Sequence, residues 1–144
     1  MDKAINWNFL EKYIPRLELV ALKEHAEGEE KDHFIELLDH VEKQIKAMPQ
    51  ILEYSEKKAK DITIGMHYFG GATDYWIYEL DQDTLEGFGY VCLFGMYENA
   101  ELGSVYIPEI LQIPFIELDL YWDDKKTLLP IMEKIQEIAK GVYR

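Results

Sequence analysis

The chain has 144 residues, of which 48% are hydrophobic and 30% charged, so it is long and apolar enough for one globular domain and is not disordered. No apolar run approaches the length of a membrane span, charges lie where a signal peptide is apolar, and the single cysteine, Cys92, excludes an internal disulfide, which together predict a soluble cytoplasmic protein. The formal net charge of −13 disfavours direct contact with nucleic acid or with an anionic membrane.

The first third of the chain has helical periodicity. Apolar residues between positions 5 and 27 recur at helical spacing, and Pro15 and Gly28 divide the region into two short helices. A stronger amphipathic pattern runs from Glu29 to Met48, and Pro49 ends it.

Between residues 62 and 118 the period changes from that of a helix to that of a strand. The sequence predicts strands at 62–69, 75–80, 88–94, 102–107 and 115–118. The run at 88–94 is apolar on both faces, which favours the central position in the sheet. Short links join neighbouring runs, so the sheet should be antiparallel, and helical spacing returns from Leu128 to Ala139. We therefore expect an α+β domain with an antiparallel sheet of about four to five strands, packed on one face with N- and C-terminal helices.

The middle of the chain carries six short motifs in a fixed order: MPQILEY (48–54), ITIGMHYFGG (62–71), YWIYELD (75–81), GFGYV (87–91), ELGSVYIPEI (101–110) and IELDLYW (116–122). In order and spacing, this series resembles domain of unknown function family 2958, small proteins of bacteria, plasmids and phages. The resemblance implies a small α+β fold and a link to mobile genetic elements, and it assigns no catalytic residue. We accordingly divide the single domain, 1–144, into a helical N-terminal extension (1–39), a sheet-containing core (40–126) and a C-terminal helix (127–144).

One set of side chains has the spacing of a metal site. Glu29, His33, Glu36 and His40 fall on one side of a predicted helix, and imidazole and carboxylate groups so spaced can converge on a transition metal. The alternative is the polar flank of an amphipathic helix, stabilised by Glu–His pairs four residues apart. We predict no cofactor, and the metal hypothesis rests on His33, Glu36 and His40.

Two pairs of carboxylates have the spacing for acid–base chemistry. Glu79 and Asp81 are two residues apart in a predicted strand, as are Glu117 and Asp119, so the members of each pair should share a face. With tryptophans nearby as apolar walls, such pairs would suit a small hydrolase. The alternative is solvated strand edges, because a segment this rich in acids produces such pairs by chance.

Charge and aromatic residues are both unevenly distributed. Residues 61–124 contain 13 acids and no Lys or Arg, and 13 of the 19 aromatic residues lie between Tyr68 and Trp122. A sheet explains many of these rings, but strand alternation places aromatics on both faces and leaves some exposed beside carboxylates, as in a protein interface. The residues predicted to form this binding surface are Tyr75, Trp76, Tyr78, Glu79, Asp81, Glu117, Asp119 and Trp122.

These patterns favour a non-enzymatic binding protein that presents an acidic, aromatic surface to a basic protein partner. With the mobile-element resemblance, they predict an inhibitor of a basic, nucleic-acid-binding host or defence protein, in which carboxylates occupy sites meant for DNA phosphates. Two alternatives remain open. One is a small carboxylate- or metal-dependent hydrolase, and the other is a structural or assembly protein that forms a homodimer through its N-terminal helices.

Overall fold

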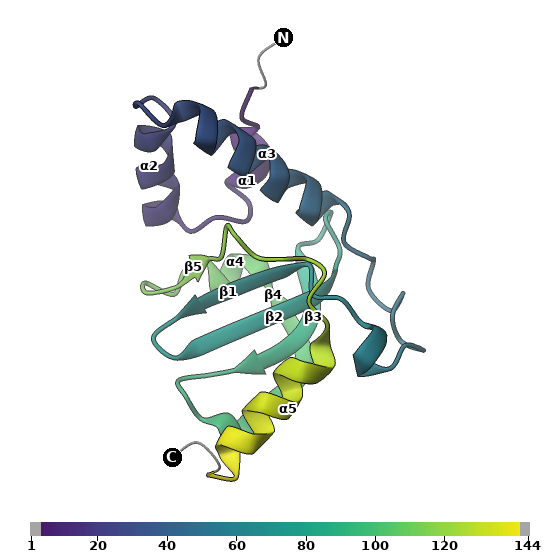
Figure 1. Cartoon of the computed structure of the whole chain (residues 1–144). Coiled ribbons are helices and arrows are strands. Elements are labelled where there is room, and N and C mark those ends of the chain that lie inside the picture. Colours follow the sequence, from purple (N-terminus) through teal and green to yellow (C-terminus); the bar gives the residue numbers. More distant parts are fainter. Residues whose placement is uncertain (1–3, 142–144) are drawn as a thin grey trace.

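The computed structural model describes residues 4–141 and has the α+β architecture that the sequence predicts (Figure 1). A five-stranded antiparallel sheet lies between N-terminal helices and a C-terminal helix. Residues 1–3 of the predicted N-terminal extension and residues 142–144 of the predicted C-terminal helix lie outside the described residues.

Helices come before and after the sheet, with short ones between the strands. The α-helices are α1 (Trp7–Leu10), α2 (Arg16–His25), α3 (Lys31–Lys46), α4 (Ile107–Ile110) and α5 (Leu128–Ala139), and the 3-10 helices are η1 (Ala59–Asp61) and η2 (Tyr97–Asn99). Pro15 precedes α2 and Gly28 lies in the turn before α3, which confirms the two predicted interruptions. The sequence prediction lacks α4, which Pro108 favours because proline suits the first turn of a helix. No helix within residues 4–141 has both the length and the apolarity needed to cross a bilayer.

The strands pair in the order β4-β3-β2-β1-β5, each with an antiparallel neighbour. They are β1 (Met66–Gly70), β2 (Thr73–Leu80), β3 (Glu86–Cys92), β4 (Glu101–Tyr106) and β5 (Glu117–Leu118). The prediction that residues 88–94 form the central strand is wrong. The chain returns after α4 to pair β5 with β1, so β2 has two strands on each side.

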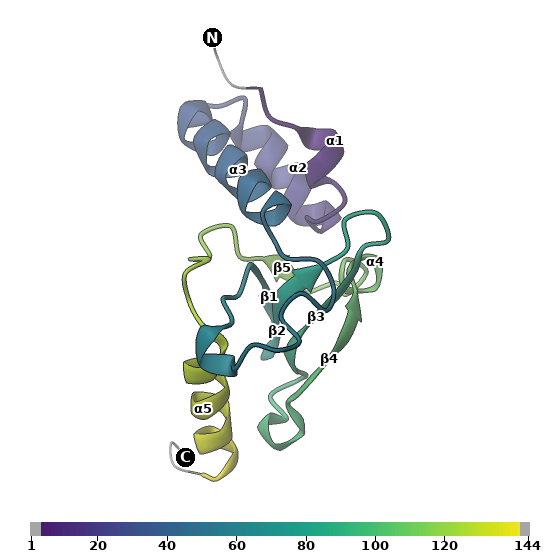
Figure 2. The ribbon, with the colours of Figure 1, turned by 90° about the vertical axis from the view of Figure 1, so that its right-hand side faces the viewer.

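Helices cover both faces of the sheet, so the prediction of helices on one face is wrong. On one face, Ile77 packs with side chains of α1, α2, α3 and α4. On the other face, Trp76 and Tyr78 pack with Leu128 and Ile135 of α5. Figure 2 places α4 and α5 on opposite sides of the sheet in agreement with these contacts. Aromatic residues on either face of β2 therefore face a helical layer, where the prediction expected some to face solvent.

A β-bulge in β2 changes which of its side chains share a face. The pairing register between β2 and β3 shifts between Ile77 and Glu79. Beyond the shift, Leu80 packs in the same core as Ile77, whereas Glu79 lies beside Tyr78 on the α5 side. Without a bulge, alternation would have placed Glu79 with Ile77 and Leu80 with Tyr78.

The segment before β1 departs from the predicted strand at 62–69. Ile62 and Ile64 pack in the core on the α5 side, whereas Met66 and Tyr68 pack in the core on the opposite face. Alternation along one strand at 62–69 would place these four side chains on one face, but the chain crosses between the faces at Gly65. Regular pairing with β2 begins only at Met66.

Buried hydrogen bonds connect the N-terminal helices to the sheet region. The Tyr68 hydroxyl donates to the carbonyl oxygen of Tyr13 over 2.5 Å, and the Gln44 amide donates to the carbonyl oxygen of Trp122 over 2.9 Å. Burial raises the pKa of Tyr68 well above its ordinary value, so its hydroxyl keeps the proton that this bond needs. The helices of the N-terminal extension therefore share polar contacts as well as apolar core with the strands.

Candidate functional site

The aromatic residues predicted to form a binding surface lie mostly in the interior. Trp76, Tyr78 and Trp122 are only 8%, 5% and 8% exposed, and Tyr75 is half-buried. The Trp122 ring nitrogen donates to the carbonyl oxygen of Ile64 over 2.9 Å, so its one polar atom is already satisfied. These three rings stabilise the core and offer no anchor to a partner.

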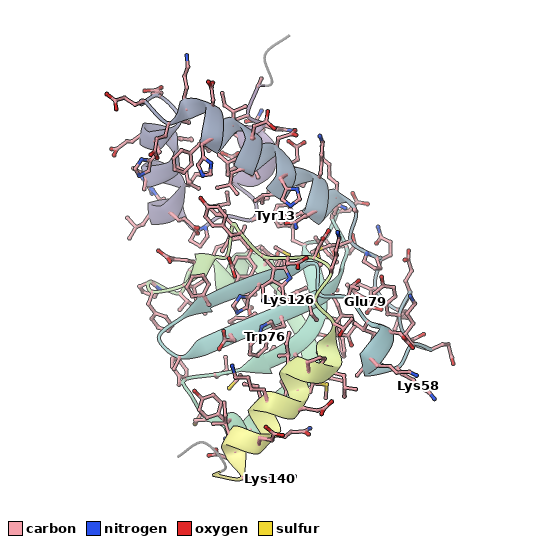
Figure 3. The ribbon with its side chains drawn as sticks, in the orientation of Figure 1. Tyr13, Lys58, Trp76, Glu79, Lys126 and Lys140 are labelled. Carbon is pink, nitrogen blue, oxygen red and sulfur yellow. The ribbon has the colours of Figure 1, made fainter. Side chains whose placement is uncertain are left out.

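The members of the first predicted carboxylate pair both follow the β-bulge, but they have different partners. Glu79 is buried on the α5 side, and its Oε2 accepts a hydrogen bond from the Tyr54 backbone N–H over 2.8 Å (Figure 3). Asp81 lies in the turn after β2, where its Oδ1 accepts from the backbone N–H groups of Asp83 and Thr84. The two carboxylates therefore do different structural work and do not form an acid–base pair.

The second predicted pair lies near a third carboxyl group. Glu117 is exposed and Asp119 is half-buried, and Glu18 of α2 accepts a hydrogen bond from the Leu118 backbone N–H over 2.8 Å. The pKa of Glu18 is raised to about 7: burial raises it most, the Leu118 N–H lowers it, and the charges of Glu117 and Asp119 raise it. The charges of Glu117 and Asp119 therefore act on Glu18 at the β5 edge of the sheet.

His67 of β1 is held between two carboxylates. Its Nε2 lies 2.8 Å from Oδ1 of Asp74, and its Nδ1 lies 3.2 Å from Oδ2 of Asp119. The ring is stacked on Trp76 at 5.4 Å and tilted against Trp122 at 4.9 Å. Through these contacts the His67 ring joins β1, β2 and the loop after β5.

The predicted metal ligands do not converge in the structure. Glu29 lies in the turn before α3 and is not on the helix, and His33 makes a 2.9 Å hydrogen bond with the Tyr121 hydroxyl. Within residues 4–141, no three His, Cys, Asp or Glu side chains are grouped so that they could hold a metal ion. His33, Glu36 and His40 therefore form no metal centre in this part of the chain.

The acids of residues 61–124 make no ion pair with a Lys or Arg of residues 4–141. The lysine ion pairs found there join Lys43 to Asp39 and Lys46 to Glu42, all within α3. His67 alone makes ion pairs with acids of the segment, among the described residues. Of the 13 acids, only Glu79 is buried. Most of these carboxylates thus remain open to a cation from outside.

These carboxylates do not form one continuous surface. Glu101 lies on β4 and Glu117 on β5, and these strands are the opposite edges of the sheet. The acids of residues 61–124 therefore do not lie on the single acidic surface that we expected from the sequence. The strand order divides it between two edges.

The β4 edge carries backbone groups without a partner strand. Ile107 N–H donates to the Leu85 carbonyl just beyond the ladder between β3 and β4. Because bonded residues alternate in an antiparallel ladder, the N–H and C=O groups of Leu102, Ser104 and Tyr106 point away from β3. The described residues place no other strand on this side (Figure 2).

A groove of about 350 Å³ runs beside this edge on the α4 side of the sheet. Its apolar lining includes Tyr75, Val91 and Ile110, and its acidic lining is Glu101 and Glu109. A Cβ added at Gly103, which also lines the groove, would meet nothing within 4 Å. Glu98 and Glu86 line two further grooves, and each of these grooves also borders β4. We call β4 with these four glutamates the acidic edge.

Sequence reasoning missed Glu18, the pairing of His67 with Asp74, and the four glutamates of the acidic edge as site residues. The turn at Gly71 and Ala72 sets the register of β1 against β2 and places His67 and Asp74 on one face, which the Gly70-Gly71 turn signal could have indicated in advance. No sequence pattern identified Glu18 as a site residue, because its partner Leu118 is 100 residues away in the chain. In comparisons with known proteins, no family model, no curated protein and no solved structure matches this chain.

Proposed function

We propose that this chain is a non-enzymatic binding protein whose acidic edge takes an extended, basic segment of a partner protein. The observation that carries the proposal is the free backbone of β4, bordered by four glutamates that have no Lys or Arg ion pair within residues 4–141. Added strands gain affinity from main-chain hydrogen bonds and specificity from alternate side chains. Surrounding carboxylates attract basic segments and speed their encounter.

A second copy of the chain is a poorer occupant of this edge. Two β4 strands paired with each other would bring two sets of the same four glutamates together, and like charges at an interface cost free energy. A lysine- or arginine-bearing strand would instead neutralise Glu101 and Glu109, and the groove over Gly103 has room for one of its apolar side chains.

The mobile-element resemblance supports a concrete version of this proposal. A basic protein of the host cytoplasm that binds nucleic acid, such as a nuclease or defence factor, would be inhibited if this chain occupied its phosphate-binding surface. Carboxylates on a protein surface can take the places of phosphates because both are anions that accept hydrogen bonds from Arg and Lys.

The test compares two variants of equal charge in affinity capture from host lysate. The edge variant carries Glu86→Gln, Glu98→Gln, Glu101→Gln and Glu109→Gln; the control variant carries Glu24→Gln, Glu27→Gln, Glu53→Gln and Glu56→Gln, all exposed positions outside the acidic segment. We expect the wild type and the control variant to retain the same basic proteins in a salt-sensitive way, and the edge variant to lose them. If both variants retain the same proteins, the proposal is wrong.

A hydrolase is the second candidate, favoured by the raised pKa of Glu18, which burial and the nearby Glu117 and Asp119 bring to about 7. A carboxylic acid and carboxylates together could act as acid and base. The test is hydrolysis of generic ester, phosphodiester and glycoside substrates between pH 5 and 9. Activity lost in Glu18→Gln would support this candidate, and absence of any turnover would exclude it for these substrates.

The homodimer candidate is favoured by two exposed apolar side chains on α2. Leu17 is 78% exposed and Val20 is 49% exposed, three residues apart on one helix. Sedimentation velocity at micromolar concentration tests it directly. A dimer that Leu17→Glu dissociates would support the candidate, and a monomer would exclude it under those conditions.

A further inference from the structure

Glu79 is a buried carboxylate with no cationic partner in residues 4–141. Its side chain is 3% exposed, and the described residues give it one hydrogen bond, from the Tyr54 N–H to Oε2. Buried carboxylates are normally paired with a cation, because removing the charge from water is otherwise costly. The other carboxylate oxygen of Glu79, Oε1, has no cationic partner in the described residues.

An apolar pocket of about 370 Å³ opens onto this carboxylate. Three aromatic rings wall it. Tyr54 is stacked with Tyr78 at 6.4 Å between centroids, and Phe88 meets Tyr78 edge to face at 5.7 Å. Much of the remaining lining is aliphatic, including Met132 of α5. The combination of one acid and several rings matches the general form of a small-molecule site.

Local backbone geometry aims Glu79 into the pocket. The β-bulge between Ile77 and Glu79 turns the carboxylate to the α5 side, where regular alternation would have sent it to the opposite core. The segment that follows α3 closes the pocket, because Pro49 accepts a backbone hydrogen bond from Leu80 and Tyr54 donates to Glu79. In Figure 3, Glu79 lies between the end of β2 and the segment that carries η1.

The aromatic wall is suited to a cation. The Lys57 ammonium already lies over the Tyr54 ring, 4.4 Å from its centroid, at the rim of the pocket. A cation is attracted to the face of an aromatic ring, and more strongly where water is excluded. Burial, followed by the charge of Glu79, raises the pKa of the Tyr78 hydroxyl above its ordinary value, so Tyr78 stays neutral and Glu79 supplies the negative charge of the pocket.

We propose that this pocket binds a small organic ammonium ion, whose charged head pairs with Glu79 while its apolar body lies among Tyr54, Tyr78 and Phe88. None of the four glutamates of the acidic edge lines this pocket, although Leu102 of β4 does. The bulge, the unpaired carboxylate and the aromatic walls all favour the same ligand class: a primary amine on an apolar chain or ring.

The test is a titration of the full chain, followed by amide NMR, with 4-phenylbutylammonium and with its neutral counterpart 4-phenylbutanol. We expect the ammonium to bind at least about tenfold more tightly than the alcohol, which is about 1.4 kcal/mol, with shifts centred on Tyr54, Tyr78 and Phe88. Equal affinity for the two compounds, binding of neither, or shifts elsewhere would overturn the proposal.

Glu79→Gln separates the carboxylate's charge from its structural role. Glutamine keeps an oxygen for the Tyr54 N–H, so the fold should persist while the preference for the ammonium disappears. Glu53→Gln removes the same charge at an exposed neighbouring position and should leave the preference intact. A preference that survives Glu79→Gln, or that Glu53→Gln removes equally, would assign it to the general negative charge of the protein and contradict the proposed site.

Discussion

The carboxyl group of Glu18 makes stability depend on pH. Burial is the main cause of its pKa of about 7 in the folded protein, against an ordinary value of 4.5. The folded state therefore binds more protons than the unfolded state between these values. The contribution of the neutral group to stability is fully present below pH 4.5 and is lost as pH rises through about 7.

Replacing Glu18 by glutamine should remove this dependence. Glutamine keeps an acceptor for the Leu118 N–H, so Glu18→Gln should be about 1–3 kcal/mol more stable than wild type at pH 8 and nearly equal to it at pH 4.5. Urea denaturation at both pH values gives the two differences, and other titrating groups cancel in the comparison. A difference that is the same at both pH values would contradict the assignment.

His67 should be the histidine on which the fold depends most. His67→Ala leaves Asp74 and Asp119 without their partner and opens a gap beside Trp76, so we expect a loss of about 2–4 kcal/mol in the free energy of unfolding. The control is His40→Ala, at an exposed position of α3, which should change stability by less than about 0.5 kcal/mol. Equal losses in the two variants would refute a structural role for the two carboxylate contacts.

At the scale of elements, the segment between α3 and β1 depends on Glu79. This stretch, residues 47–65, contains only η1 as regular structure. Within it, the Tyr54 N–H donates a hydrogen bond to the Glu79 carboxylate of β2. Glu79→Ala should lower stability by about 1–3 kcal/mol and speed hydrogen exchange at the Tyr54 amide. Glu53→Ala is the matched control at an exposed position. Unchanged exchange at Tyr54 in Glu79→Ala would show that other contacts hold the segment.

Elements with a strong period were predictable, and elements fixed by distant contacts were not. Apolar spacing gave the long helices at 31–46 and 128–139, and short links gave the antiparallel pairing. The hydrophobic periodicity of the sequence does not reveal the bulge in β2 or the crossing at Gly65, because both depend on how β2 pairs with the neighbouring strands. The same limit applied to the site. The sequence drew attention to Glu79, but only the bulge decides which face it occupies.

At the scale of the whole molecule, strand order decides what the acidic composition can do. The absence of Lys and Arg from residues 61–124 was evident from the sequence, and so was the excess of acids. The sequence could not predict that β4 and β5 would lie at opposite edges, because the chain between them passes through α4. Two separate acidic regions result, and the one along β4 also carries unpaired backbone groups and an open groove at Gly103.

Amide hydrogen exchange on a complex with a captured basic partner tests the central claim most directly. The amides of Leu102, Ser104 and Tyr106 point away from β3, so in the free protein they should exchange faster than those of Gly103 and Val105. If a segment of the partner adds to the edge as a strand, exchange at these three amides should slow by about tenfold or more on binding. Exchange at all three that stays as fast as in the free protein would contradict binding at the β4 edge.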